Sequence, residues 1–195
     1  MKGFLSDVFR VGVSKLIIIV SGFATSIVVA RVLGPEKNGI ITSLLVYPTI
    51  FMTVGSLGVR QSVTFLLGKE KYSERSLKEA IFQIWILTSI VSTILCFSLI
   101  YFFSRTHKDL SLIVLAVAPI TFSLFNTYCS GIYLGKNKIS EFNAINWIPA
   151  AVTTVMSFLF LVIFKSGIDG YLISVFRAIH HVFHLVFQGG VSSIF

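Results

Sequence analysis

The sequence predicts an all-α membrane protein, built as a bundle of five to six transmembrane helices, and two observations carry this prediction. Apolar side chains make up 55% of the 195 residues and charged ones only 12%, whereas water-soluble domains carry about 25% charged residues. The apolar residues also gather in long runs, and a run of about 20 is the length of a helix that crosses the hydrocarbon core of a bilayer. A water-soluble fold is therefore excluded.

Short polar turns separate six apolar runs, which we expect to form one transmembrane helical domain over residues 1–195. The first five runs are long enough to cross a bilayer, and the sixth is interrupted by Arg177 and three histidines. The turns are too short to hold a soluble domain, so consecutive helices are expected to pack as antiparallel neighbours. The expected spans lie near residues 11–33, 40–67, 80–103, 110–134, 142–164 and 171–187.

The first turn, "GPEKNG" at residues 34–39, carries clear breaker residues. Gly34 can take a positive φ and close the preceding helix, and Pro35 fixes the turn that follows. Later spans contain Pro48, Pro119 and Pro149, each of which removes a backbone hydrogen bond and tends to kink its helix.

The net charge of +8 is better explained by membrane orientation than by nucleic-acid binding. When the N-terminus is placed in the cytoplasm, the segments on that side carry more Lys and Arg than those on the other side, as the positive-inside rule requires. We therefore expect a multi-pass protein with a cytoplasmic N-terminus and no nucleic-acid partner.

A polar stripe runs along one side of the first expected helix and includes Lys15, Ser21, Thr25 and Ser26. These residues fall within an arc of about 140° at the helical period. Two interpretations remain open: small and hydroxyl residues allow close helix packing, or the stripe lines a hydrated cavity. A lysine at the edge of the stripe favours water on that side.

Four basic residues, Lys15, Arg31, Arg60 and Arg177, stand inside the expected spans and are candidates for ligand binding. Charges within a membrane are costly and by default indicate function. All eight Asp and Glu residues fall in expected turns or in the N-terminal tail, so these cations lack a fixed anionic partner and suit an anionic ligand such as a phosphate. For Lys15 and Arg31 the alternative is that the side chain extends to the nearby membrane surface.

Catalytic and metal-binding motifs do not stand out in the sequence. His180, His181 and His184 form the densest group of possible ligands, but no acid or thiol stands near them in the sequence to complete a zinc site. We expect no metal, no cofactor and no enzymatic activity, since phosphate loops and nucleophile motifs are also missing from the sequence.

Three segments carry a resemblance to a known family. The first, "ARVLGPEKNG" at residues 30–39, is followed by Leu57, Gly58 and Ser62; the others are "SGIYLGKNKISEFNAIN" at residues 130–146 and "GIDGYLIS" at residues 167–174. They resemble the N-terminal half of the polysaccharide repeat-unit flippases. These flippases belong to the superfamily of multidrug, oligosaccharidyl-lipid and polysaccharide exporters.

The resemblance implies one lobe of a two-lobe flippase in the bacterial cytoplasmic membrane. Such a protein moves undecaprenyl-pyrophosphate-linked oligosaccharides to the outer leaflet for O-antigen, capsule or exopolysaccharide synthesis. Cations in a central cavity are implied to hold the pyrophosphate and acidic sugars, a role that Lys15 and Arg60 match, whereas Arg31, Gly34 and Pro35 belong to the turn motif. Implied partners are the lipid-linked oligosaccharide, membrane lipids, glycan-assembly proteins, and a second half or a second copy of the chain.

Three other functions remain open. A drug or metabolite exporter of the same superfamily would be expected to carry a membrane-buried acid for ion coupling, and the expected spans contain none. A membrane scaffold that assists glycan assembly without transport would depend on helix packing and not on Lys15 and Arg60. An inactive fragment would depend on neither.

Overall fold

The computed structural model describes residues 2–69, 73–103 and 109–186, and this part of the chain is helical, without a strand. The expected all-α bundle is confirmed. Residue 187, the end of the last expected span, lies outside the described residues. The elements are α1 (Lys2–Gly55), α2 (Val59–Gly68), α3 (Glu74–Phe103), α4 (Leu110–Val117), α5 (Pro119–Gly135), α6 (Ile139–Phe158), the short π-helix η1 (Leu159–Ile163) and α7 (Gly167–Val186).

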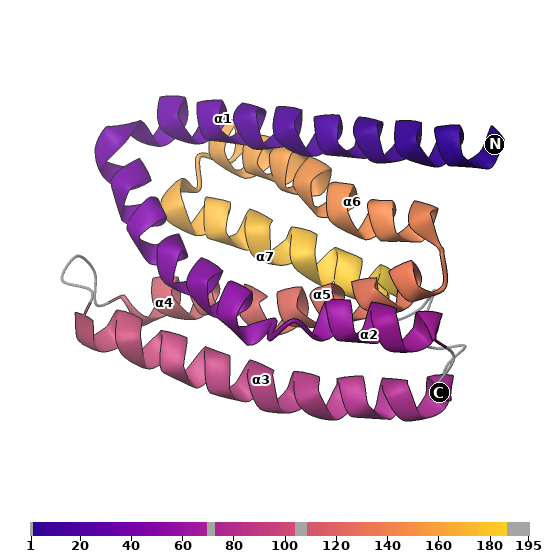
Figure 1. Ribbon diagram of the computed structural model, residues 1–195. Coiled ribbons are helices and arrows are strands. Elements are labelled where there is room, and N and C mark those ends of the chain that lie inside the picture. The colour runs from indigo at the N-terminus through magenta and orange to yellow at the C-terminus, as the bar shows by residue number, and fades with distance from the viewer. Residues whose placement is uncertain (1, 70–72, 104–108, 187–195) are drawn as a thin grey trace.

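Helix α1 is two helical arms joined at Gly34, whose φ of 74° and ψ of 175° are not helical. We call residues 2–33 the first arm and residues 35–55 the second arm. Glycine adopts this left-handed φ at little cost, and Pro35 can start the second arm at once because the first position of a helix needs no N–H donor. The bend is therefore tighter than the six-residue turn expected from the sequence, and the two arms diverge from it (Figure 1).

Four helical stretches of the described chain are long and apolar enough to cross a membrane: Phe9–Gly68, Arg75–Phe103, Leu110–Gly135 and Ile139–Ile163. The first of these contains both arms and α2, and folds back on itself at Gly34. Large apolar side chains cover the outer surface, as with Phe102, which is 78% exposed. Such a surface suits lipid and not water, so the chain is a multi-pass membrane protein.

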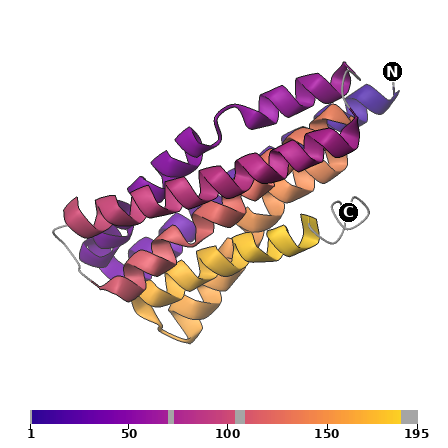
Figure 2. The same ribbon diagram turned by 90° about the horizontal axis from the view of Figure 1, so that it is seen from below.

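Successive segments of the bundle run in alternating directions (Figures 1 and 2). The first arm packs along α6, α2 packs along α5, and α7 contacts both α6 and α5. We call the end of the bundle where Gly34 lies the bend end, and the opposite one, where Lys2 and Gly68 lie, the N-terminal end. This alternation places the bend and the start of α7 at one end of the bundle, and the N-terminus and the end of α2 at the other (Figure 1).

The second expected span, residues 40–67, is broken between α1 and α2. Leu57 and Gly58 have positive φ values of 47° and 69°, which interrupts the helical hydrogen-bond ladder. The hydrocarbon core offers no water to a freed carbonyl, and here the fully buried Tyr128 satisfies it: its hydroxyl donates to the carbonyl oxygen of Gly55 at 2.6 Å. The same hydroxyl lies 2.9 Å from Oγ1 of Thr88 on α3.

Two glycines let α2 approach α5 closely. An added Cβ at Gly131 would lie 2.7 Å from the carbonyl oxygen of Arg60, and one at Gly135 would lie 2.7 Å from Cβ of Leu67. Small residues spaced four apart allow membrane helices to pack backbone to backbone. Thr64 adds a hydrogen bond across this contact, from its hydroxyl to the carbonyl oxygen of Gly131 at 3.2 Å.

The Gly131→Ala variant is expected to destabilise the protein by about 1–3 kcal/mol, the usual cost of overpacking a tight contact, because its methyl group would meet the rigid backbone of α2. Thermal unfolding in detergent measures this effect. Gly12→Ala is the matched control, since nothing lies within 4 Å of an added Cβ there. Equal thermal stability of the Gly131 variant and the wild type would contradict the close contact.

The Tyr128→Phe variant is expected to cost about 1–3 kcal/mol, because it leaves the buried carbonyl of Gly55 without a donor. The comparison is with Tyr101→Phe on the exposed surface of α3, which should leave the unfolding temperature unchanged. If both variants unfold at the wild-type temperature, Tyr128 does not stabilise the helix break.

Candidate binding groove

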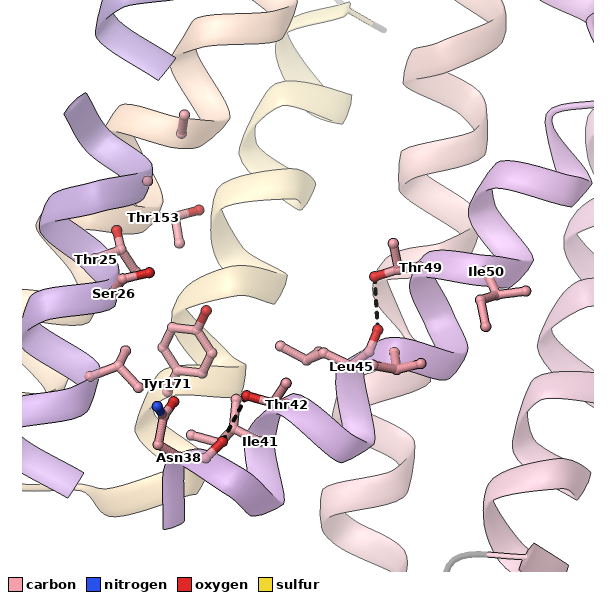
Figure 3. Close-up of a pocket in the computed structure, with 14 residues that line it drawn as sticks. Thr25, Ser26, Asn38, Ile41, Thr42, Leu45, Thr49, Ile50, Thr153 and Tyr171 are labelled. Carbon is pink, nitrogen blue, oxygen red and sulfur yellow. Dashed lines mark hydrogen bonds between the residues drawn. The ribbon is translucent and has the colours of Figure 1, made fainter. Parts of the chain in front are cut away.

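A cavity of about 670 Å³ opens between the two arms of α1 near the bend, and α6 and α7 form its back wall (Figure 3). Its size falls in the range of small-molecule sites, about 300–1,000 Å³. We call it the groove. It is lined by Gly22, Thr25, Ser26, Val29, Asn38, Ile41, Thr42, Leu45, Val46, Thr49, Ile50, Ala150, Thr153 and Tyr171.

The groove is uncharged, and polar and apolar residues line it together. Half of its lining residues carry a hydroxyl or an amide, and no lining residue is an acid, a lysine, an arginine or a histidine. At about 30 Å³ for each water in the liquid, the cavity has room for roughly 20 water molecules. An uncharged hollow that presents hydroxyl and amide groups suits a polar, neutral group.

The polar stripe of the first arm divides between packing and groove. Oγ1 of Thr154 on α6 lies 3.0 Å from the carbonyl oxygen of Ser21 and 2.9 Å from Oγ1 of Thr25, so these residues join the first arm to α6. Ser26 is exposed in the groove, while Thr25 touches both the groove and α6, and Ser21 is not a lining residue. Helix packing therefore accounts for Ser21 and Thr25, and the cavity accounts for Ser26 and for the side of Thr25 that lines it.

A second stripe, in which three of four residues are polar, lies on the second arm and was missed by the sequence reasoning. Asn38, Thr42, Leu45 and Thr49 follow the i, i+4, i+7, i+11 spacing that puts residues on one helical face, and all four line the groove. The hydroxyls of Thr42 and Thr49 donate to the carbonyl oxygens of Asn38 and Leu45, at 2.9 Å and 2.8 Å (Figure 3). This helical spacing of polar residues is the pattern by which the second stripe could have been found in the sequence.

The basic residues of the first arm lie outside the groove. Lys15 is exposed and stands seven residues before the groove residue Gly22. At 100° and 1.5 Å per residue, the two residues share a helical face and lie about 10 Å apart along the axis. Arg31 is also exposed, three residues before Gly34 at the bend end.

Arg60 and Arg177 do not line the groove either. Arg60 is half-buried on α2, with its main chain against Gly131. Arg177 is exposed on α7, and its guanidinium carbon lies 5.9 Å from the ring centroid of Phe160, a cation–π distance. The groove therefore does not collect the four basic side chains.

No carboxylate among the described residues forms an ion pair with Lys15, Arg31, Arg60 or Arg177. An intramembrane cation that lacks an acidic partner remains available to an anion. The sequence predicted a cavity lined by cations. The structure instead has an uncharged groove, and Lys15 lies beyond it on the same face of the first arm.

Among the histidines of α7, His180 packs against the rings of Phe122, Phe176 and Phe183. The ring centroid of His180 lies 5.3 Å from that of Phe122 and 5.5 Å from that of His184. Within the described ranges, no three His, Cys, Asp or Glu side chains lie close enough to hold a metal ion.

Comparison with known proteins finds a family and a fold. A family model described as "Polysaccharide biosynthesis protein" matches residues 4–184, as the sequence motifs led us to expect. The fold is similar to that of a MOP superfamily transporter from Pyrococcus furiosus, for which a reversed polarity of the binding pocket suggests a different function. The identity is 12% and the TM-score 0.70, over 95% of this chain and 45% of that one. The comparison with curated proteins finds no match.

The Ser26→Cys variant is expected to react with a water-soluble maleimide in membranes, because residue 26 lines an open groove that has room for water. Ile27→Cys is the control at the same depth: its side chain is 39% exposed, lies outside the groove and should face lipid. The native thiols of Cys96 and Cys129 are free but buried, so their background should be low. Equal labelling of the two variants would contradict a hydrated groove.

Proposed function

The chain belongs to the family of polysaccharide biosynthesis proteins, and on this basis we propose that it is one half of an exporter of lipid-linked glycans. Its substrate is an undecaprenyl-pyrophosphate-linked oligosaccharide repeat unit. The unit crosses the bacterial cytoplasmic membrane for the synthesis of O-antigen, capsule or exopolysaccharide. The N-terminal end of the bundle lies in the cytoplasm, where these lipids are made.

The observation that carries this proposal is a polar groove at membrane depth with Lys15 on the same helical face. A helix that met only lipid would gain nothing from hydroxyls and a lysine on one side. The lysine and the groove together match a ligand with one anionic part and one neutral polar part. A lipid diphosphate that carries sugars has both parts.

The two cations nearer the N-terminal end have the clearest roles. Lys15 and Arg60 would bind the pyrophosphate of a lipid that enters from that end, because ammonium and guanidinium groups form charge-assisted hydrogen bonds with phosphate oxygens. Arg31 stands beside the bend, at the opposite end, and would anchor the helix at the membrane surface. Arg177 would serve as a further contact from α7.

Transport itself requires a partner in this proposal. The chain spans 45% of the length of the transporter whose fold it resembles, and alternating access needs two bodies that move relative to each other. A separately encoded half or a second copy of this chain would supply the other wall of the substrate path.

The competing functions have weaker support. An ion-coupled drug exporter is disfavoured because the apolar runs of the sequence contain no carboxylate. A scaffold without transport would leave the polar groove and the alignment of Lys15 with it unexplained.

The Lys15→Gln and Arg60→Gln variants are each expected to weaken binding of undecaprenyl pyrophosphate in lipid nanodiscs by about 10- to 100-fold, since a hydrogen bond to a charged group contributes about 1.5–3 kcal/mol. Export of surface glycan in cells should fall in parallel, with protein levels in the membrane unchanged. Lys15→Arg should retain binding, because it keeps the charge.

Arg75→Gln is the control for these two variants, because Arg75 is exposed and pairs with Glu79 at 3.2 Å, outside the groove. Wild-type binding and export by both Lys15→Gln and Arg60→Gln would refute the role of the cations in substrate binding.

A further inference from the structure

Four polar side chains of the groove have no hydrogen-bond partner among the described residues: Ser26, Asn38, Thr153 and Tyr171. They come from the two arms of α1, from α6 and from α7, and they surround one open space (Figure 3). Unpaired polar groups at membrane depth are costly unless water or a ligand bonds to them. The groove thus presents donors and acceptors that helix packing does not use.

Tyr171 gives the groove an aromatic surface. Its side chain rises from α7 between the two arms (Figure 3), and its ring packs against the cluster of Val29, Ile41 and Leu161. Tyrosine presents an apolar ring face and a polar tip. A pyranose has matching features, because C–H groups cover its faces and hydroxyls surround its rim.

The other three groups suit the hydroxyls of a sugar. Serine and threonine hydroxyls both donate and accept, and the amide of Asn38 offers two donors and an acceptor. A sugar hydroxyl also donates and accepts, so it can pair with any of them. A site built in this way rejects ligands that lack the hydroxyls, since its own groups would then stay unpaired.

The absence of charge among the lining residues limits which sugars fit. The carboxylate of an acidic sugar would lose hydration in the groove and find no cation there, which is unfavourable. Uncharged sugars have no such cost. The lining therefore favours neutral sugars over the acidic ones that a cation-lined cavity would hold.

We propose that the groove is a subsite for a neutral sugar of the transported glycan, separate from the site of the pyrophosphate; this inference rests on the proposed function. Lys15 lies about 10 Å along the same helical face from Gly22. A single lipid-linked glycan can then place its diphosphate near Lys15 and its sugars in the groove, with the more distant sugar against Tyr171, which packs with Val29 about 21 Å along the axis from Lys15. Specificity for the glycan resides in the hydroxyl and amide groups, and affinity for the lipid carrier resides in the cations.

The test uses the full chain in lipid nanodiscs and three probes: undecaprenyl pyrophosphate alone, the same lipid bearing a neutral disaccharide, and the same lipid bearing a disaccharide with one uronic acid. The wild type should bind the neutral glycolipid about tenfold more tightly than the bare lipid, as one or two additional hydrogen bonds would give. The uronic-acid lipid should show no such gain.

The decisive variant is Thr153→Val combined with Tyr171→Phe, which removes two hydroxyls that bond to no described residue. Its unfolding temperature should match the wild type, and it should lose the preference for the neutral glycolipid while binding the bare lipid normally. Thr127→Val combined with Tyr101→Phe makes the same chemical changes outside the groove and should keep the preference.

Each result decides the proposal. Retention of the preference by the Thr153/Tyr171 variant overturns it, as does a wild type that prefers the acidic disaccharide or gains nothing from either sugar. If no pyrophosphate lipid binds, the proposed function fails. The free neutral disaccharide then decides on the groove: binding that the double variant abolishes supports the subsite, and no binding overturns it.

Discussion

The structure depends on one constraint: within a bilayer, every interruption of a helix must be satisfied by the protein itself. The bend at Gly34 lies at the end of the bundle, where the glycine takes the positive φ and Pro35 has no N–H that needs a partner. The break at residues 56–58 lies deeper and requires the hydroxyl of Tyr128, held between Gly55 and Thr88. Because α5 supplies this tyrosine, the path of the second arm and the position of α5 are fixed together, and the glycine contact between α2 and α5 continues the same interface.

Much of the fold could be predicted from the sequence, because runs of about 20 apolar residues have few alternatives to a membrane helix. The bend was also predictable, since Gly34-Pro35 combines a positive φ with a helix start. The break at Leu57-Gly58 was not predicted, because it falls inside an uninterrupted apolar run whose glycines could equally serve packing. The prolines were ambiguous as well: Pro119 begins a new helix, whereas Pro48 and Pro149 lie inside continuous ones. Whether such a proline begins a helix or lies inside one depends on neighbouring helices and not on local sequence.

The binding groove was only partly predictable. A polar stripe on the first arm identified Thr25 and Ser26, but helical periodicity could not tell which of its residues face α6 and which face the cavity. The groove also needs Asn38 from the second arm, Thr153 from α6 and Tyr171 from α7, and nothing in the sequence indicates that these helices meet. The basic side chains were expected to line the cavity because a charge in lipid is costly. Lys15 instead occupies an exposed position beyond the groove on the same helix. Family membership indicates a role in polysaccharide synthesis, and the uncharged lining is a separate property of this chain.

The bend at Gly34 has a mechanical consequence. The first arm packs on α6, whereas the second arm continues into α2, which packs on α5, and α7 joins these two sides by contacting both α6 and α5. At 1.5 Å per residue, the 32 residues of the first arm extend about 48 Å from the pivot. A rotation of about 5° between the two arms at this single glycine would therefore displace the far end of the first arm by about 4 Å. Widening of the hollow would then require α7, which contacts both α6 and α5, to slide against one of them.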